Sequence, residues 1–88
     1  MKTFKDLEFK NHPMGQGVQA LIYFDNGYGA SVVRSEHTYG GSDGLYEMAV
    51  LKNGNITYDT PITDDVIGYL TEEGVTEYLQ KIQELWKR

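Results

Sequence analysis

An Asn-Gly pair separates two apolar segments in residues 18–35, which read VQALIYFDNGYGASVVRS. Both segments are rich in β-branched, aromatic and aliphatic residues, a composition typical of strands. Asn and Gly tolerate the positive φ that a two-residue type I′ turn requires. Asn26-Gly27 therefore predicts a hairpin with strands over 18–25 and 28–35.

The register of this hairpin follows from the length of its loop. A two-residue loop places Leu21 opposite Val32 and Ala20 opposite Val33. In that register, one face carries Val18, Ala20, Ile22, Phe24 and Val33, and the other carries Leu21, Tyr23, Tyr28, Ala30 and Val32. Both faces of the predicted hairpin are apolar.

A second Asn-Gly pair, Asn53-Gly54, stands between two further strand-like segments. It predicts another type I′ hairpin, with strands over 45–52 and 55–59 and Leu51 opposite Ile56. Residues 4–10 form a possible fifth strand, although Phe4 and Leu7 differ in parity and so interrupt the alternation.

The C-terminal segment carries one apolar stripe with helical spacing: Val75, Tyr78, Leu79, Ile82, Leu85 and Trp86. These positions predict an amphipathic helix over about 72–86. Thr71 is placed to cap its N-terminus, and Glu72 and Glu73 lie where the helix dipole favours negative charge.

Residues 60–70 connect the last strand to this helix, and Pro61 ends the strand. The connection is apolar enough to fold over the edge of the sheet, with Ile62, Val66, Ile67, Tyr69 and Leu70 partly packed. The fold class is therefore α+β: a single domain, residues 1–88, with a four- to five-stranded antiparallel meander and the helix packed on one face.

Composition excludes several classes of function. The 88 residues include 13 Asp and Glu against 8 Lys and Arg, a net charge of −5, so binding to nucleic acid is not expected. The chain has no cysteine, which excludes disulfides and thiolate metal sites. We expect no membrane association, since no apolar run approaches the ~20 residues of a membrane span. The expected location is the cytoplasm, no cofactor is expected, and so short a chain favours a protein that is not an enzyme.

The two apolar faces of the strands bear on self-association. One helix covers one face, and an uncovered apolar face normally marks an interface. The pattern therefore indicates a homo-oligomer that associates through this face or through a strand edge. The alternative is that the N-terminal segment, the 61–70 connection and curvature of the sheet cover the second face within the chain.

A meander sends alternate connections to opposite ends of the sheet. Loops 11–17, 35–44 and 60–65 are therefore expected together at the end opposite the two Asn-Gly turns, and this end is the predicted functional surface. It carries His12, Glu36, His37, Asp43, Asp64 and Asp65. Their spacing selects no metal geometry, so a metal-dependent hydrolase is an alternative of low rank.

The run Gly40-Gly41-Ser42-Asp43-Gly44 matches the G-x-S-x-G pattern of hydrolases, but a strand follows it where that motif needs a helix. It fits a recognition loop or a turn better, or a nest of backbone N–H groups for an anion with Arg34 beside it. Tyrosine is enriched at interfaces, and four are candidates for contact: Tyr28, Tyr39, Tyr46 and Tyr58. Tyrosine is also a common half-buried strand residue, and for each of the four a core or strand position is favoured over a contact.

Several segments together resemble small proteins encoded by tailed phages and prophages. They are Phe24–Gly29, Tyr39-Gly40-Gly41, Gly44–Glu47 and above all Tyr58–Leu70. The resemblance spans most of the chain and contains no catalytic motif. It implies an accessory protein that binds a host or phage protein, for example one of a defence system, inside a bacterial host.

Three functions follow in order of preference: a binding protein that self-associates, a sponge for a nucleotide or small anion at residues 40–44, and a metal-dependent hydrolase. We predict no catalytic or metal-binding residues. The candidate binding residues are Arg34, His37, Tyr39, Gly40, Gly41, Asp43, Tyr46, Asp64 and Asp65.

Overall fold

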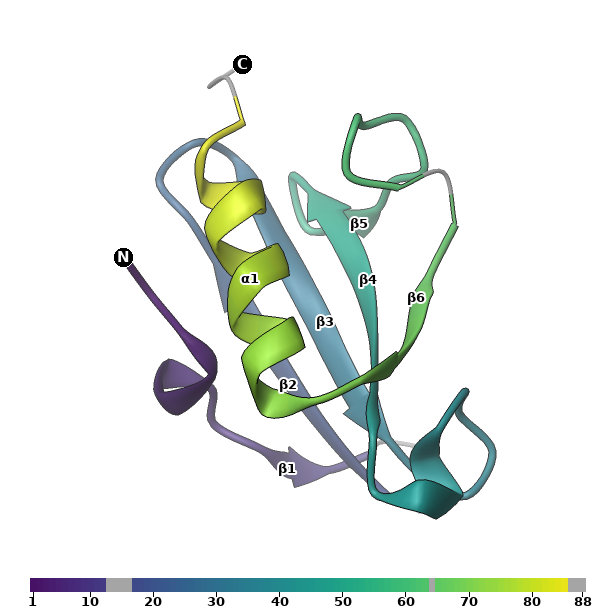
Figure 1. Ribbon diagram of the computed structural model, residues 1–88. Helices are drawn as coiled ribbons and strands as arrows, with labels where there is room; N and C mark the ends of the chain where they lie inside the picture. Colours follow the sequence, from purple (N-terminus) through teal and green to yellow (C-terminus); the bar gives the residue numbers. More distant parts are fainter. Residues whose placement is uncertain (13–16, 64, 86–88) are drawn as a thin grey trace.

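One antiparallel sheet forms the framework of the protein in a computed structural model, which describes residues 1–12, 17–63 and 65–85 (Figure 1). Five strands follow each other in meander order, and a sixth pairs with the fourth. The strands are β1 (Lys10–Asn11), β2 (Val18–Tyr23), β3 (Tyr28–Arg34), β4 (Tyr46–Lys52), β5 (Asn55–Ile56) and β6 (Ile67–Leu70). The helices are the 3-10 turns η1 (Phe4–Asp6) and η2 (Gly41–Asp43) and the helix α1 (Glu72–Gln83). The predicted α+β class is confirmed.

The helix α1 begins where the sequence predicts. Thr71 is the N-cap, and its hydroxyl accepts a hydrogen bond from the Gly74 N–H at 3.0 Å. Val75, Leu79 and Ile82 are fully buried against the sheet, so the predicted stripe faces inward. The helix itself ends at Gln83, and residue 86 lies outside the described residues.

The second hairpin is also confirmed. Leu51 pairs with Ile56, and both turn residues have positive φ, 52° at Asn53 and 84° at Gly54, as a type I′ turn requires. Its second strand is shorter than the predicted 55–59, because β5 ends at Ile56.

The first hairpin has a three-residue loop, so its predicted register is wrong by one residue. The Gly27 N–H donates to the Phe24 carbonyl (3.2 Å), and the Phe24 N–H donates to the Tyr28 carbonyl (2.8 Å). Only Gly27 adopts positive φ in this loop, which fits a type I turn followed by a glycine bulge. Leu21 consequently pairs with Ser31 rather than with Val32.

Asn26 explains why the longer loop forms. Its side-chain amide donates to the carbonyls of Ile82 (2.9 Å) and Leu85 (3.1 Å) at the end of α1. Its Oδ1 accepts from the Tyr28 N–H at 3.0 Å. The turn thus caps the helix C-terminus, whose last carbonyls have no partner within the helix.

The corrected register changes which residues share a face of the sheet. The even-numbered residues of β2, β3 and β4 lie under α1 and form the core; they include Ala20, Ile22, Tyr28, Ala30, Val32, Tyr46, Met48 and Val50. The predicted separation of Ala20 and Ile22 from Ala30 and Val32 is therefore wrong.

The opposite face of the sheet, here called the open face, is not covered by any helix of the described residues. Gly29, Ser31, Ala49 and Leu51 form its buried floor. Leu21, Tyr23 and Ile56 project around this floor with about half of each residue exposed, 51%, 56% and 54%. Other described segments do not cover it, because Phe4, Leu7, Phe9, Ile62 and Ile67 all pack against the core on the helix side. In the described residues, the N-terminal segment and the 61–70 connection therefore do not cover this face, although Ser31, Ala49 and Leu51 in its floor are only 9%, 7% and 4% exposed.

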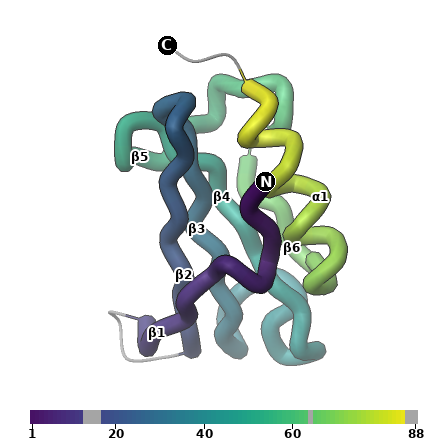
Figure 2. The backbone as a smooth tube through the Cα atoms, turned by 90° about the vertical axis from the view of Figure 1, so that its left-hand side faces the viewer, coloured from purple at the N-terminus to yellow at the C-terminus, as the bar shows by residue number. Residues whose placement is uncertain are grey.

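The N-terminal segment is not a strand over 4–10. Figure 2 shows it running beside α1 towards β1. The turn η1 lets Phe4, Leu7 and Phe9 all pack on the core despite their different parity, and the rings of Phe4 and Phe9 contact Tyr46 with centroids 5.2 and 5.4 Å away. Only Lys10 and Asn11 pair with β2.

The connection before α1 also differs from the prediction. Ile67–Leu70 forms β6 on the same edge of β4 that β5 occupies further along. The loop between β5 and β6 lies at the end of the sheet where β5 and the Asn53-Gly54 turn lie (Figure 1). The prediction that residues 60–65 join loop 35–44 is therefore wrong, because β6 carries the chain back along the sheet before α1 begins.

Candidate functional site

Loop 35–44 meets β6 at one edge of the sheet, and the contact brings two exposed tyrosines together. The Tyr69 N–H donates to the Tyr39 carbonyl at 3.1 Å. The exposed fractions of the two residues are 60% for Tyr39 and 64% for Tyr69, the highest among the described large hydrophobic residues after Met1. We call these two residues the tyrosine pair.

Each member of the tyrosine pair lies against a glycine beside the other. A Cβ on Gly68 would come within 2.5 Å of the Tyr39 Cβ, and one on Gly40 within 3.0 Å of the Tyr69 ring. Neither position has room for a side chain without a shift. The two segments therefore fit together at a close approach that glycine alone permits.

Tyr69 has a φ of 57°, in the left-handed region that bulky residues rarely occupy. Such a conformation costs on the order of 1–3 kcal/mol and persists where the surrounding structure imposes it. Tyr69 lies in an irregular stretch of β6, between Ile67 and Leu70, which pair with β4, and its N–H is bonded to Tyr39; these contacts on both sides hold the conformation. The strained conformation does not serve to bring the Tyr69 side chain into the core, because that side chain is largely exposed.

The glycine-rich run is a series of hydrogen-bonded turns. Within it, the N–H groups of Gly41, Asp43, Gly44 and Leu45 donate to carbonyls of the same loop, at 2.9–3.0 Å. They are therefore not available as a nest for an anion. At the start of the loop, the Thr38 hydroxyl accepts from the Ser35 N–H and donates to the Ser35 carbonyl.

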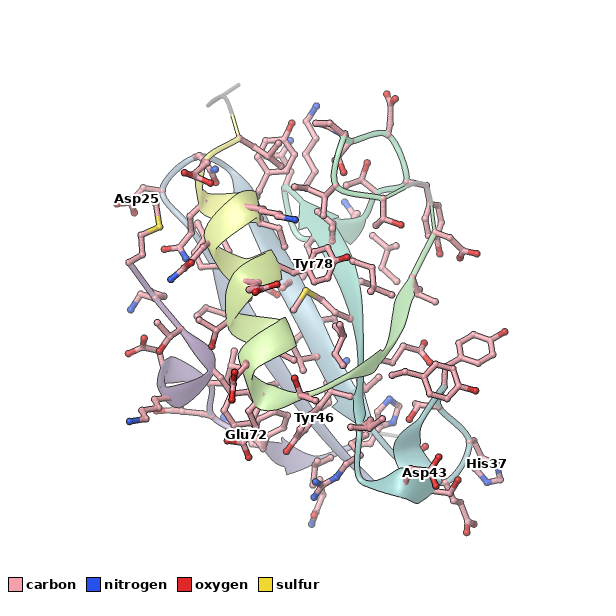
Figure 3. The ribbon with its side chains drawn as sticks, viewed as in Figure 1. Asp25, His37, Asp43, Tyr46, Glu72 and Tyr78 are labelled. Carbon is pink, nitrogen blue, oxygen red and sulfur yellow. The ribbon has the colours of Figure 1, made fainter. Side chains whose placement is uncertain are left out.

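Arg34 does not point into this loop as a free cation. Its guanidinium lies over the Tyr46 ring, 5.0 Å from the centroid, and donates to the Tyr46 hydroxyl at 3.2 Å. Tyr46 (labelled in Figure 3) and Tyr28 are both buried, 7% and 8% exposed, so each takes the core position that the sequence favours over an exposed contact. Several donors of the anion-binding alternative are therefore already bonded within the protein: three N–H groups of the glycine-rich run and one N–H group of Arg34.

The remaining predicted site residues separate into two groups. His37 and Asp43 project from the loop at the end of the sheet opposite Asp25 (Figure 3), and Gly40 and Gly41 belong to the same loop. Asp65 lies in the β5–β6 connection, where its carboxylate accepts from the Val66 N–H at 2.7 Å. Asp64 lies outside the described residues.

Acidic groups accompany the tyrosine pair. The Glu47 carboxylate accepts from the Tyr39 N–H at 2.8 Å, and Glu36 lies 3.6 Å from the exposed His37 ring. In residues 1–12, 17–63 and 65–85, no three His, Asp or Glu side chains gather closely enough to hold a metal ion. The site presents aromatic rings and carboxylates.

Sequence reasoning named Tyr39 and Gly40 but missed Gly68, Tyr69 and Glu47. The Gly68-Tyr69 dipeptide repeats the Tyr39-Gly40 pair in reverse order, which is the only signal that the sequence offered. Positive φ at a tyrosine leaves no trace in composition or periodicity.

Comparison with known proteins gives no match: no family model, curated protein or solved structure is significantly similar to this chain. No helix in the described part of the chain has the length and apolar character needed to cross a membrane.

Proposed function

We propose that this protein is a small binding protein without catalytic activity, and that the tyrosine pair is its contact with another protein. One observation carries the proposal: two tyrosines, 60% and 64% exposed, are fixed on hydrogen-bonded backbone, and one of them is held at strained φ. Rigid tyrosines provide large contact area at low entropic cost and are enriched among the residues that dominate binding energy.

The charge around the pair indicates the kind of surface that it would bind. Glu36, Asp43 and Glu47 belong to the same loop or the adjoining strand, and the whole chain carries −5. A partner surface with Lys or Arg would gain from this charge and from stacking on the tyrosine rings. The resemblance to phage accessory proteins makes a cytoplasmic protein of a bacterial host the first partner to test, and the phage origin itself stays a prediction.

Tyr69→Asn tests the proposal because it separates binding from folding. Asn tolerates left-handed backbone, so the variant should unfold at the same temperature as the wild type or a few degrees higher. Binding should fall at least about tenfold, as for a residue at the centre of an interface. Affinity capture from bacterial lysate, followed by titration of the captured protein, measures the second effect.

Tyr58→Ala is the matched control, because Tyr58 is 52% exposed but lies outside the pair. It should capture the same protein as the wild type. Capture that persists in Tyr69→Asn and Tyr39→Ala would place the contact elsewhere. A rise in melting temperature with nucleotides would favour the anion-binding alternative instead.

A further inference from the structure

The strand β2 has one free edge over most of its length. On one side β3 pairs with all six of its residues, but on the other side β1 pairs only with Val18 and Gln19. Figure 2 shows this edge: the N-terminal segment crosses near β1, and the rest of β2 has no strand beside it. Among the described residues, no strand pairs with Ala20–Tyr23 on this side.

The backbone groups at this edge can be assigned from hydrogen bonds at both ends of β2. The Phe24 N–H donates towards β3, whereas the Gly17 carbonyl accepts from His12 on the β1 side. Because these directions alternate along an antiparallel strand, Leu21 and Tyr23 direct their N–H and C=O groups to the free edge.

This edge also lacks the features with which proteins usually protect a strand. Charged side chains, proline and bulges discourage pairing with another chain. Residues 20–23 include none of these, and Leu21 and Tyr23 are 51% and 56% exposed. The segment is therefore a template for a further strand.

We propose that a second copy of this chain supplies that strand, with the two β2 strands antiparallel around a two-fold axis at Ile22. Leu21 and Tyr23, whose backbone groups point to the free edge, lie one residue on either side of this axis. Leu21 of each copy therefore lies opposite Tyr23 of the other. Each such pair exchanges two backbone hydrogen bonds, four in total. The exposed side chains of Leu21 and Tyr23 then pack across the junction on the open face.

Charge and shape at the ends of the strand favour a second copy over an unrelated peptide. In this arrangement β2 of the second copy ends its pairing near its Asp25, which then lies next to the exposed Lys10 at the end of β1. The two-fold axis repeats this contact between Asp25 and Lys10, so the dimer contains it twice. The surface is hollowed at both ends of the free edge, and the N-terminal segment borders both hollows: Met1 and Lys2 lie beside Tyr23 and Asp25 at one end, and Glu8 lies beside Leu21 and Lys10 at the other. These hollows leave room for the ends of an added strand.

The proposed dimer does not depend on the tyrosine pair. That pair lies at the β6 edge, on the opposite side of the sheet from β2. Both surfaces can therefore be occupied at once, and failure of one proposal leaves the other intact.

Light scattering over micromolar to millimolar concentrations tests the dimer. The wild type should reach twice the 10.0-kDa mass of one chain. Tyr23→Pro should remain a monomer, because proline removes an N–H directed to the edge but none bonded to β3. Ile56→Lys is the matched control: Ile56 is 54% exposed on the open face but lies away from β2, so this variant should still dimerise.

Cysteine cross-linking gives a second measurement in case Tyr23→Pro fails to fold. The chain has no cysteine, so a disulfide can form only between introduced residues. An oxidised mixture of Leu21→Cys and Tyr23→Cys should give mainly the mixed dimer. A monomeric wild type, a dimer lost in Ile56→Lys but kept in Tyr23→Pro, or cross-linking without preference for the mixed pair would overturn the proposal.

Discussion

Asn26 links two elements that are far apart in the sequence. Its amide hydrogens reach the carbonyls of Ile82, Gln83 and Leu85, while its carbonyl oxygen holds the backbone of its own turn. A helix leaves its last carbonyls without partners, and a side-chain donor from outside the helix satisfies them. One residue therefore fixes both the loop length of the first hairpin and the position of the helix end over it.

We expect Asn26→Asp to lower the free energy of unfolding by about 1–3 kcal/mol. The substitution replaces the donor with a carboxylate and places negative charge at the negative end of the helix dipole. Urea denaturation measures the loss. Asn53→Asp is the control, since that turn lies in solvent and Asp also tolerates positive φ; it should change the free energy by no more than about 0.5 kcal/mol. An equal loss in both variants would contradict a capping role.

At the scale of the element, α1 supplies the cover for one face of the sheet. Leu79 and Ile82 are fully buried and belong to the core, whereas Gln80 is exposed on the outer face of the same helix. The helix is short, at 12 residues, and its stability therefore depends on packing rather than on its own propensity.

Ile82→Ala should cost about 2–5 kcal/mol, because it removes apolar contacts and leaves a cavity between helix and sheet. Gln80→Ala, two residues away on the exposed side of the helix, should change stability by less than about 0.5 kcal/mol. Thermal and urea unfolding of the two variants measure the two losses of stability. Similar stabilities would mean that this face of the helix carries little of the fold.

The elements that could be predicted from the sequence are those whose signals are local. The stripe of α1 with its Thr71 cap, and the Asn53-Gly54 turn, depend on residues close together in the chain. The first turn was mistaken because the same Asn-Gly pair fits a two- or three-residue loop, and a contact with α1, 56 residues away, selects the longer one. A one-residue change in register then moved Ala30 and Val32 to the face of Ala20 and Ile22.

The candidate site was only partly predictable for the same reason. Tyr39 and Gly40 lie in a loop that the sequence marks clearly. Tyr69 reaches them only because β6 adds to the edge of β4, and a four-residue strand that contains glycine gives no strong pattern. The Arg34 guanidinium lies over the ring of the buried Tyr46, a contact that spacing alone does not reveal.

At the scale of the whole molecule, the two proposed surfaces lie at opposite edges of one sheet. A dimer joined through β2 would therefore carry two tyrosine pairs, one at each outer edge. Such a dimer would bind a multivalent partner more tightly than either site alone, provided that the geometry allows both to engage.

The attachment of the N-terminal segment to α1 has a consequence for the order of folding. Gln83 exchanges two hydrogen bonds with the Lys2 backbone, and Thr76 accepts from the Phe4 N–H. These contacts close loops of 81 and 72 residues, whose entropic cost the chain meets most easily after the sheet and helix have formed. We expect Phe4→Ala to accelerate unfolding several-fold and to leave the refolding rate almost unchanged, as stopped-flow kinetics in urea can show. Val32→Ala, in the central strand, should slow refolding; a similar slowing by Phe4→Ala would mean that the segment docks early. In the expected order, the segment before β1 detaches and reattaches while the sheet remains folded.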